Sequence, residues 1–400
     1  MCEVAALLSI DEAQRLILER VRPLEVERIA LDSAAGRVTA EPAVARVDLP
    51  PFDSSAMDGF CVRAEDTPGR LPVVARIPAG RPAERALGPG ETMAIATGGA
   101  VPPGGDAVIP LEYVVDHDNE IEIAEPVPRG ANVRPRGGDV HRGDVVVEQG
   151  ERLGAAQVGA LAAGGIADIS CSRRPRAAVL ATGSELRRPG EKLGPGEIYE
   201  ANGVLLAAQL RTAGAEVERL EPVEDDERAH REALEAGLKA DVLVTSGGVS
   251  VGPHDLVRSV GGELGIEEVL WGVAAKPGKP LWFGVRDRTL VFGLPGNPVS
   301  TLVCFELFVR PAVLALQGAA EPLPRFAPGR LGRAIRPNPT RTELVRARSS
   351  VVDGDVQLDV LSGQESHMIA RAAGADTLVL LPPGGEELPA GSRVNYLRLV

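Results

Sequence analysis

The sequence predicts a multidomain protein in which a doubly wound α/β domain is joined to two β-rich modules. The chain has 400 residues, more than the roughly 100–200 of one typical domain. Between residues 174 and 317, short apolar strands alternate with helical periods, a pattern typical of a parallel sheet covered on both faces. Residues 47–139 and 321–400 instead carry short valine and isoleucine runs broken by Gly- and Pro-rich turns, which predicts β structure.

The N-terminal part predicts a helix followed by a module that the chain enters twice. Ser9 and Glu12 have the spacing of a capping box, and the apolar residues from Ala13 to Val21 follow a helical period. The sequence texture of 24–46 returns at 140–172, so we expect these segments to pair with the β-rich module inserted between them. The predicted units are residues 1–46 (N-terminal helix and first part of a linker domain), 47–139 (inserted β-rich domain), 140–173 (second part of the linker domain), 174–320 (α/β domain) and 321–400 (small C-terminal β domain).

Composition excludes several classes of protein. The 43 basic and 56 acidic residues give a net charge of −13, which argues against nucleic-acid and anionic-membrane partners. No uninterrupted apolar run approaches the ~20 residues of a membrane span, and the acidic N-terminus does not resemble a signal peptide. The 4 Cys show no C-x-x-C spacing and the 5 His no H-x-x-x-H pair, so we expect reduced thiols, no zinc site and a cytoplasmic protein.

Candidate ligand-binding loops follow the predicted strands of the α/β domain. In open α/β sheets, ligands bind at the carboxyl ends of the strands. The polar segments found there lie at 182–185, at Asp225 and Asp226, at 246–252 and at 294–298. Lys276 and Lys279 follow a further strand, so we expect all of these groups at one edge of one sheet.

The segment 246–252, SGGVSVG, has the character of an anion cradle. Its glycines allow backbone N–H groups to approach a ligand, and the following helix offers its N-terminal dipole. The segment matches neither a Walker loop nor G-x-G-x-x-G. A simple strand-to-helix turn is the alternative, and Asp255 has the alternative role of a helix N-cap or first-turn acid.

The lysines are stronger evidence for an anion-binding site than the glycine segment. Only 4 of the basic residues are Lys, and Lys276 and Lys279 stand in one turn, KPGK. An ammonium group binds phosphate or an oxyanion as a point charge, although an exposed turn is the alternative. Glu185, Asp225 and Asp226 offer carboxylate oxygens for Mg²⁺ beside a phosphate, with ordinary solvated loops as the alternative.

The β-rich module has dense polar loops of its own. They are the run 53–60, DSSAMDGF, with Thr97 before two glycines and Asp139 after two more. Turn chemistry alone is the alternative explanation for each. From the residues alone, we expect a cytosolic enzyme or binder of a phosphorylated ligand, whose identity these patterns leave open.

The motifs together resemble the molybdopterin molybdenumtransferase family, which includes the C-terminal domain of gephyrin. The matching blocks are PPFDSSAMDGF, ATGGAVPPGGDAVIPLE, RPRGGDVHRGD, LATGSEL, VTSGGVSVGPHD, KPGKP and LPGNPVS. They occur in the family's order over residues 10–400. SGGVSVG alone would indicate only the wider molybdopterin-binding domain, whereas SAMDG, KPGKP and the C-terminal β domain favour the molybdenumtransferase.

The resemblance implies a four-domain protomer that forms a homodimer with its active site between subunits. The implied reaction inserts molybdenum from molybdate into adenylylated molybdopterin and releases AMP, with Mg²⁺ assisting. Transient contacts with molybdopterin adenylyltransferase and with molybdoenzymes are also implied. The implied catalytic residues are Asp58, Thr97, Asp139, Glu185, Asp225, Asp255, Lys276 and Lys279, with Glu185 and Asp225 as the Mg²⁺ ligands. The implied molybdopterin-binding residues are Ser246, Gly247, Gly248, Ser250, Gly252, Pro295, Asn297 and Pro298.

Two positions depart from the family pattern. Ser184 stands where an Asp is common, and Ala375-Asp376 where an Ala-Asn pair is common. Two other functions remain as alternatives: a gephyrin-like scaffold, and adenylyl transfer to molybdopterin. The absence of an adenylyltransferase domain and of a long linker argues against the scaffold, and the additional β modules argue against adenylyl transfer.

Overall fold

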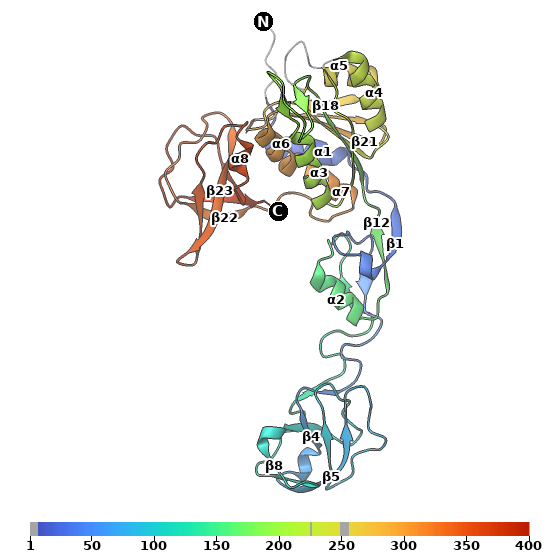
Figure 1. Cartoon of the computed structure of the whole chain (residues 1–400). Helices are drawn as coiled ribbons and strands as arrows, with labels where there is room; N and C mark the ends of the chain where they lie inside the picture. Colours follow the sequence, from blue (N-terminus) through green and yellow to red (C-terminus); the bar gives the residue numbers. More distant parts are fainter. Residues whose placement is uncertain (1–6, 225, 249–255, 400) are drawn as a thin grey trace.

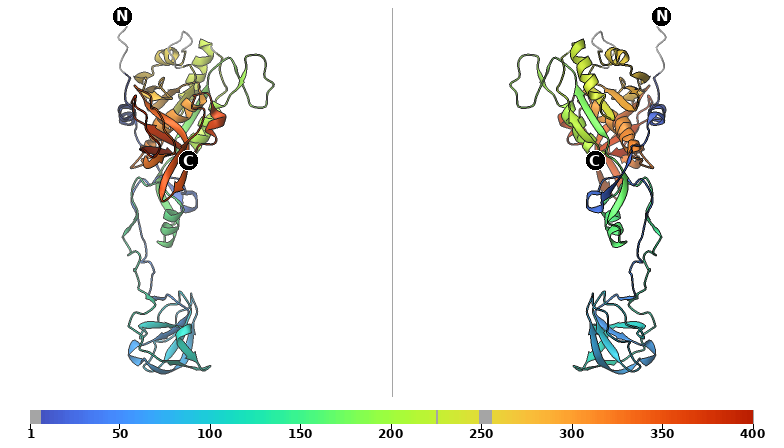
Figure 2. Two further views of the ribbon diagram at one scale, coloured as in Figure 1. Left: turned by 90° about the vertical axis from the view of Figure 1, so that its left-hand side faces the viewer. Right: turned by 90° about the vertical axis from the view of Figure 1, so that its right-hand side faces the viewer.

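A computed structural model describes residues 7–224, 226–248 and 256–399 as an elongated molecule. The α/β domain forms a head with the C-terminal β domain beside it. A slender neck leads from the head to a separate β module at the far end, and the views in Figures 1 and 2 agree on this separation. The candidate residues of the α/β domain and those of the β module therefore lie at opposite ends of the molecule.

The head is built on a six-stranded sheet. Its strands, in spatial order, are β16 (Glu216–Arg219), β13 (Arg176–Ala181), β17 (Val242–Ser246), β21 (Thr289–Leu294), β20 (Trp282–Arg286) and β18 (Glu267–Trp271). The first four strands are parallel, and β20 is antiparallel to both of its neighbours. The wholly parallel sheet expected from the sequence is thus wrong at this edge. A tight hairpin joins β20 to β21, and its positive φ falls on Asp287 (54°), where no glycine marks the turn.

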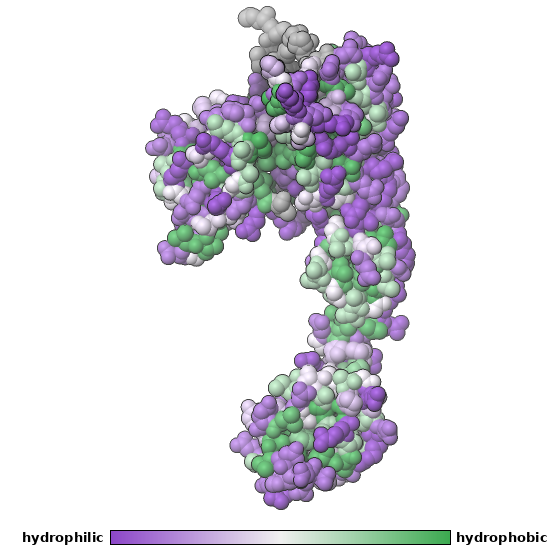
Figure 3. All heavy atoms as spheres, in the orientation of Figure 1, coloured by the Kyte–Doolittle hydropathy of each residue, from purple (hydrophilic) through white to green (hydrophobic). Residues whose placement is uncertain are grey.

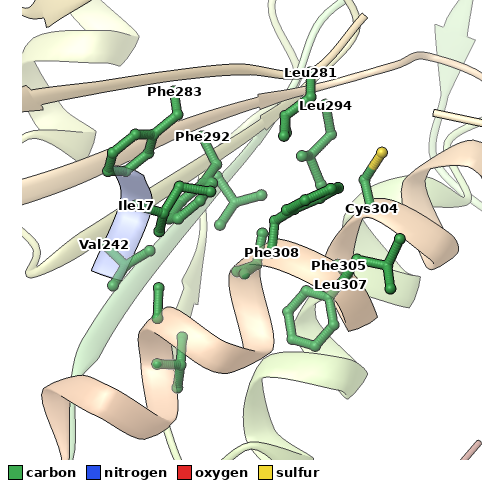
Figure 4. Close-up of a cluster of buried hydrophobic side chains, with 14 of the residues drawn as sticks. Ile17, Val242, Leu281, Phe283, Phe292, Leu294, Cys304, Phe305, Leu307 and Phe308 are labelled. Carbon is green, nitrogen blue, oxygen red and sulfur yellow. The ribbon is translucent and has the colours of Figure 1, made fainter. Parts of the chain in front are cut away.

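Helices cover both faces of this sheet, as the doubly wound prediction requires. One face packs against α1 (Ile10–Arg20), α3 (Asn202–Thr212), α6 (Pro298–Cys304), the π-helical turn η4 (Phe305–Val309) and α7 (Arg310–Leu316). The other face packs against α4 (Glu227–Gly237) and α5 (Leu256–Glu263). Figure 4 shows the core of the first face, where Phe283 and Phe292 of the sheet lie near Phe308 and Ile17 of the helices.

The segment Pro298–Leu316 is one continuous helix in which Pro311 removes a hydrogen bond. Proline has no N–H to donate to the carbonyl of Leu307, four residues earlier. Gln14 of α1 supplies the missing donor, with 2.9 Å between its Nε2 and the Leu307 oxygen. The helix is long and apolar enough to cross a membrane, yet 78% of that stretch is buried within the protein. It is therefore the central helix of the core, to which α1 is attached.

The neck forms where the chain passes out to the β module and back. Its elements are β1 (Val26–Ala30), η1 (Leu31–Ser33), β2 (Ala43–Val44), β11 (Val145–Val147), α2 (Ala155–Ala163) and β12 (Asp168–Ser172). β1 pairs with β12 and β2 with β11, both antiparallel, which is the pairing expected between 24–46 and 140–172. Where the neck meets the head, Arg173 forms a bidentate pair with Asp241 at 2.7 and 2.8 Å. Burial tends to raise the pKa of Asp241, but hydrogen bonds from Arg173 and from the Arg176 amide lower it overall.

The β module at the far end contains a second six-stranded sheet, in the order β7-β4-β6-β5-β9-β8. Its elements are β3 (Ser54–Ser55), β4 (Gly59–Val62), η2 (Ala64–Asp66), β5 (Gly69–Ile77), β6 (Thr92–Ile95), β7 (Ala107–Pro110), η3 (Leu111–Tyr113), β8 (Val114–Asp116), β9 (Glu120–Ile123) and β10 (Val133–Arg134). Its core is small and apolar, with Phe60 and Ile121 among the buried residues.

The C-terminal β domain is joined to the head through a shared strand pairing. Its elements are β22 (Ala327–Leu331), β23 (Thr342–Val352), β24 (Asp355–Val360), α8 (Ile369–Ala372), β25 (Thr377–Leu381) and β26 (Arg393–Arg398). The short strand β19 (Ala275–Lys276) leaves the α/β domain to pair with β23. Short strands β14 (Leu186–Arg187) and β15 (Ile198–Tyr199) pair at the base of a loop that stands out from the head in Figure 2.

The cysteines of the described chain are free and buried. They are Cys61, Cys171 and Cys304. Burial raises the pKa of Cys61 and of Cys304 to about 12, so both remain neutral thiols near pH 7. Cys2 lies outside the described residues.

Phe308 provides a test of the head's core. Its side chain is fully buried between the central helix and the sheet. Replacing Phe308 by Ala should lower the free energy of unfolding of the α/β domain by about 3–5 kcal/mol, because it leaves a cavity. Denaturant unfolding measures this change, and Val352→Ala, at a 45% exposed position, is the control. Equal effects of the two substitutions would contradict this packing.

Candidate active site

A cavity of about 510 Å³ lies at the carboxyl edge of the α/β sheet. Loops after three neighbouring parallel strands line it: 182–185 after β13, 246–248 after β17 and 296–298 after β21. Tyr199 and Ile198 of β15 form another side. The N-termini of α3 and α6 also face it, and their partial positive charge favours an anionic ligand.

Asn202 fastens these loops together. It is the first residue of α3, and its Nδ2 donates to Ser246 Oγ at 2.8 Å and to the Gly296 carbonyl at 2.7 Å. The carbonyl partner fixes the orientation of the amide, because only the nitrogen can donate to it. One side chain thus joins the ends of β17 and β21 to the start of α3.

Two buried polar atoms at this cavity have no hydrogen-bond partner among the described residues. They are Oδ1 of Asn202 and Oγ1 of Thr182, a residue that is 7% exposed. Leaving a buried acceptor unpaired costs about 1–3 kcal/mol, so such atoms are frequent where a ligand or water completes the bonding. The cavity wall therefore presents polar atoms ready to bind a ligand.

Gly247 and Gly248 form a close turn over Thr182. Their φ values of +94° and +65° lie in the left-handed region. A Cβ on Gly247 would lie 2.6 Å from the Thr182 carbonyl oxygen. Only glycine therefore fits at 247, which explains the Gly-Gly pair after this strand.

The carboxylates of Glu185 and Glu200 differ in their hydrogen-bond and salt-bridge partners. Glu200 is buried, accepts from the Gly203 amide at 2.5 Å and pairs with Arg219 at 2.8 Å. Glu185 is exposed at the rim, and within the described chain its carboxylate has neither a salt bridge nor a hydrogen bond. Glu185 is therefore the acid of this cavity that remains available to a ligand or cation.

The C-terminal domain supplies the remaining wall. His367 and Ile369 line the cavity, although sequence pattern assigned no role to this domain. Ser366 accepts from Asn297 Nδ2 at 2.9 Å, and its carbonyl accepts from the Val299 amide at 3.0 Å. Asn297, expected to contact the ligand, lines the cavity and also joins the two domains through its side chain.

Lys276 and Lys279 are not among the described residues that line this cavity. Both side chains are exposed, and Lys276 Nζ lies 2.9 Å from Glu343 Oε1 of β23. The turn between them rests on α6, because the Cys304 thiol donates to the Gly278 carbonyl at 3.6 Å. The lysines therefore stand near the helix whose N-terminus faces the cavity, at the junction with the C-terminal domain.

Asp58, Thr97 and Asp139 belong to the other end of the molecule. The Thr97 amide donates to Asp58 Oδ1 at 2.8 Å, so these two predicted residues lie together on the β module. Asp139 is exposed where the chain leaves this module, and its amide donates to the Leu49 carbonyl at 2.9 Å. In Figure 1 this module lies apart from the head, so one protomer does not bring these acids to the cavity.

The remaining predicted residues divide into two groups. Ser246, Gly247, Gly248 and Pro298 line the cavity, and Pro295 lies buried behind it with its carbonyl accepting from Thr301 Oγ1 at 2.7 Å. Asp225, Ser250, Gly252 and Asp255 lie outside the described residues. Asp226, the other acid considered at this loop, caps α4 by accepting from the Ala229 amide at 2.8 Å.

Comparison with known proteins agrees with this architecture over the full chain. Matching sequence families are "MoeA N-terminal region (domain I and II)" at residues 8–165, "Probable molybdopterin binding domain" at 178–315 and "MoeA C-terminal region (domain IV)" at 328–399. Molybdopterin molybdenumtransferase 2 of Mycobacterium tuberculosis is 35% identical, with 97% of this chain and 98% of the relative covered. Molybdopterin molybdenumtransferase of Haemophilus influenzae is 34% identical with the same coverage. The chain belongs to the molybdopterin molybdenumtransferase family.

A solved structure extends the similarity to three dimensions. The molybdopterin biosynthesis moeA protein from Pyrococcus horikoshii OT3 has a TM-score of 0.83 and 29% identity, covering 98% of this chain and 100% of that one. The resemblance noted from the motifs is thereby confirmed, as is the multidomain α/β and β architecture.

Sequence reasoning missed several residues of the molybdenumtransferase cavity. Three of them lie just before or at the start of α3: Tyr199, Glu200 and Asn202. The sequence marked them only by their position next to the N-terminus of a predicted helix. His367 and Ile369 had no signal, because their place depends on how two domains pack. The cavity is thus more fully enclosed than strand ends alone predict.

The turn at Gly247 can be tested against a matched glycine. Gly247→Ala should lower the free energy of unfolding because of the contact with Thr182. Gly190 has a similar φ of +96°, but no atom lies within 4 Å of the place that a Cβ would take, so Gly190→Ala carries the backbone strain alone. We expect the loss at Gly247 to exceed that at Gly190 by on the order of 1–3 kcal/mol in denaturant unfolding. Equal losses would show that the close approach is unimportant.

Proposed function

We propose that this chain inserts molybdenum from molybdate into adenylylated molybdopterin and releases AMP, as a step of molybdenum cofactor biosynthesis. The observation that carries the proposal is the cavity at the strand ends, with its glycine turn and two helix N-termini, in a chain of this family. Such a site suits a ligand that carries phosphate groups. Family membership supports this reaction over a scaffold role and over adenylyl transfer, because the relatives named for it match along the whole chain.

The cavity would bind its anionic substrate mainly through backbone groups. The residues lining it include no Lys or Arg within the described chain, whereas the protein as a whole carries a net charge of −13. Amides near Gly247 and Gly248 and the first turns of α3 and α6 are the local sources of positive potential. Thr182 Oγ1 and Asn202 Oδ1 would complete their hydrogen bonds with polar groups of the substrate.

Lys276 and Lys279 would bind the oxyanion that approaches from outside the cavity. Both ammonium groups are exposed beside α6, where a tetrahedral anion can reach them. Glu343 holds Lys276 at 2.9 Å, so an arriving anion would share or displace this ion pair. A lysine held at a defined point, rather than freely mobile, loses less entropy when it binds the anion.

Mg²⁺ is proposed as the metal that assists, with Glu185 as a ligand. The described residues contain no group of three His, Cys, Asp or Glu able to form a metal cage, and Glu185 is one free carboxylate at the rim. This donor set fits Mg²⁺, which binds through one or two carboxylates together with substrate phosphates. When bound, it would neutralise phosphate charge; Asp225 is the proposed second ligand.

The separation between cavity and β module leads to a proposed homodimer with sites between subunits. Asp58 and Thr97 form a polar pair far from the cavity of their own chain, so a second copy would have to supply them. Asp58 would then orient the ligand or handle a proton as oxygen leaves molybdate. Beside Asp58, Phe52 and Met57 are 44% and 42% exposed, and Figure 3 shows apolar surface over the neck and this module. Exposed apolar groups of this extent favour a protein partner.

We also propose a cytoplasmic location. The composition supports no nucleic-acid or membrane partner, and the apolar helix Pro298–Leu316 is accounted for as core. Transient contacts with molybdopterin adenylyltransferase and with molybdoenzymes would deliver the substrate and receive the product.

Substitution of the lysines tests the oxyanion role. Lys276→Ala and Lys279→Ala should each reduce molybdate-dependent AMP release by at least tenfold, because loss of one electrostatic donor typically costs ~10²–10³ in rate. Lys239→Ala, at an exposed position just before β17 and therefore at the amino edge of the sheet, is the control. Unchanged turnover in both Lys276→Ala and Lys279→Ala would contradict the assignment.

Mixed dimers test the site between subunits. Asp58→Ala and Lys276→Ala chains are each expected to be inactive, but a hybrid dimer has one intact site, so statistical exchange should restore about a quarter of wild-type AMP release. Asp58→Ala mixed with Asp58→Asn is the control, since both changes remove the same carboxylate and no hybrid site is intact. Absence of recovery in the first mixture, with subunit exchange verified, would contradict the arrangement.

A further inference from the structure

Arg346 is a buried cation that donates its hydrogen bonds mainly to backbone carbonyls. It lies on β23 and is 1% exposed. Among the described residues, no acid forms a salt bridge with it. Burial lowers the pKa of its guanidinium, and the negative charge of Glu365 partly offsets this effect. A buried charge is costly unless its donors are satisfied, so the acceptors it uses indicate what it does.

All of these acceptors belong to one segment, residues 363–368. The guanidinium donates to the carbonyls of Gly363 at 2.7 Å, Met368 at 3.0 Å and Glu365 at 3.3 Å, and to Gln364 Oε1 at 3.3 Å. Gln364 Nε2 in turn donates to the Arg346 carbonyl at 3.0 Å. The arginine therefore fixes the path of an irregular loop between β24 and α8.

This loop caps the helix that faces the cavity. The first-turn amides of a helix lack partners within the helix. The side chain of Asn297, the N-cap of α6, makes no capping bond, and the Val299 amide instead donates to the Ser366 carbonyl. The C-terminal domain thus satisfies an amide of α6, and the same loop carries His367 and Ile369 into the cavity wall.

We propose that Arg346 is a positioning residue that holds the 363–369 loop against the N-terminus of α6 and thereby sets the cavity wall formed by His367 and Ile369. The effect on turnover rests on the proposed function, whereas the positioning itself does not. Arg346 is buried and is not among the described residues that line the cavity, so its effect on the cavity passes through the loop. A lysine could not replace Arg346 fully. The planar guanidinium donates in several directions and reaches the carbonyls of 363, 365 and 368 together, whereas one compact ammonium group cannot reach all three.

Amide hydrogen exchange at Val299 tests the positioning directly. In Arg346→Met, exchange of this amide should accelerate by about tenfold or more, because its capping carbonyl is released. Arg346→Lys should give an intermediate rate. Arg348→Met is the matched control: Arg348 lies on the same strand, is exposed, and donates to the Gly374 carbonyl outside the loop. Amides of β17 should exchange as in the wild type in all variants.

Steady-state AMP release gives the second readout. We expect KM for adenylylated molybdopterin to rise about tenfold in Arg346→Met, with kcat changed less than about threefold, since a displaced wall weakens binding before it affects the reacting groups. A purely structural role would lower thermal stability while leaving both the Val299 exchange and KM unchanged, and that result would overturn the proposal. If Arg346→Met does not fold, Arg346→Lys decides by the same criteria. The two proposals can fail separately. If the wild-type protein releases no AMP but the Val299 amide exchanges faster in Arg346→Met, the positioning role stands and the proposed reaction is rejected.

Discussion

The hydrogen bonds of Asn202 are the constraint on which the candidate site depends. Parallel strands bring their carboxyl ends to one edge of the sheet, but the loops that follow are free to diverge. Asn202 prevents this by donating to Ser246 and to Gly296 from the first turn of α3. These two hydrogen bonds hold the ends of β17 and β21 against the start of α3, where the cavity lies.

Electrostatics explain why the site is built largely from backbone. A chain with a net charge of −13 repels molybdate and phosphate at long range. Helix N-termini and glycine amides supply local positive potential without adding mobile charges to the lining. The lysines stand outside, where Glu343 and the Gly278–Cys304 contact hold their turn. We infer that the substrate phosphate and the molybdate are met by different sets of groups.

Sequence pattern predicted well those features that depend on local structure. The capping box at Ser9 is present, and the loops at 182–185, 246–248 and 296–298 meet as the rule for parallel strands requires. The hairpin partner β20 was missed because its turn lacks glycine. The packing of α1 on the sheet was not predictable, because it depends on a carbonyl that Pro311 frees and that lies 293 residues from Gln14 in sequence.

Features formed between domains were beyond the reach of sequence pattern. Nothing local marks His367 as a cavity residue, since its position follows from the contacts of Arg346 and Ser366 with other segments. The distance between Asp58 and the cavity is likewise set by the neck, which separates the β module from the head. Motif resemblance assigned these residues to a site between subunits, and within a single chain they lie apart.

The most direct test of the proposed reaction is one incubation of the purified protein with adenylylated molybdopterin and Mg²⁺, with and without molybdate, in which released AMP is measured. We expect AMP release that requires molybdate and equals the molybdenum incorporated into the pterin. AMP release independent of molybdate, or no release under conditions where the protein is folded and dimeric, would contradict the proposed reaction.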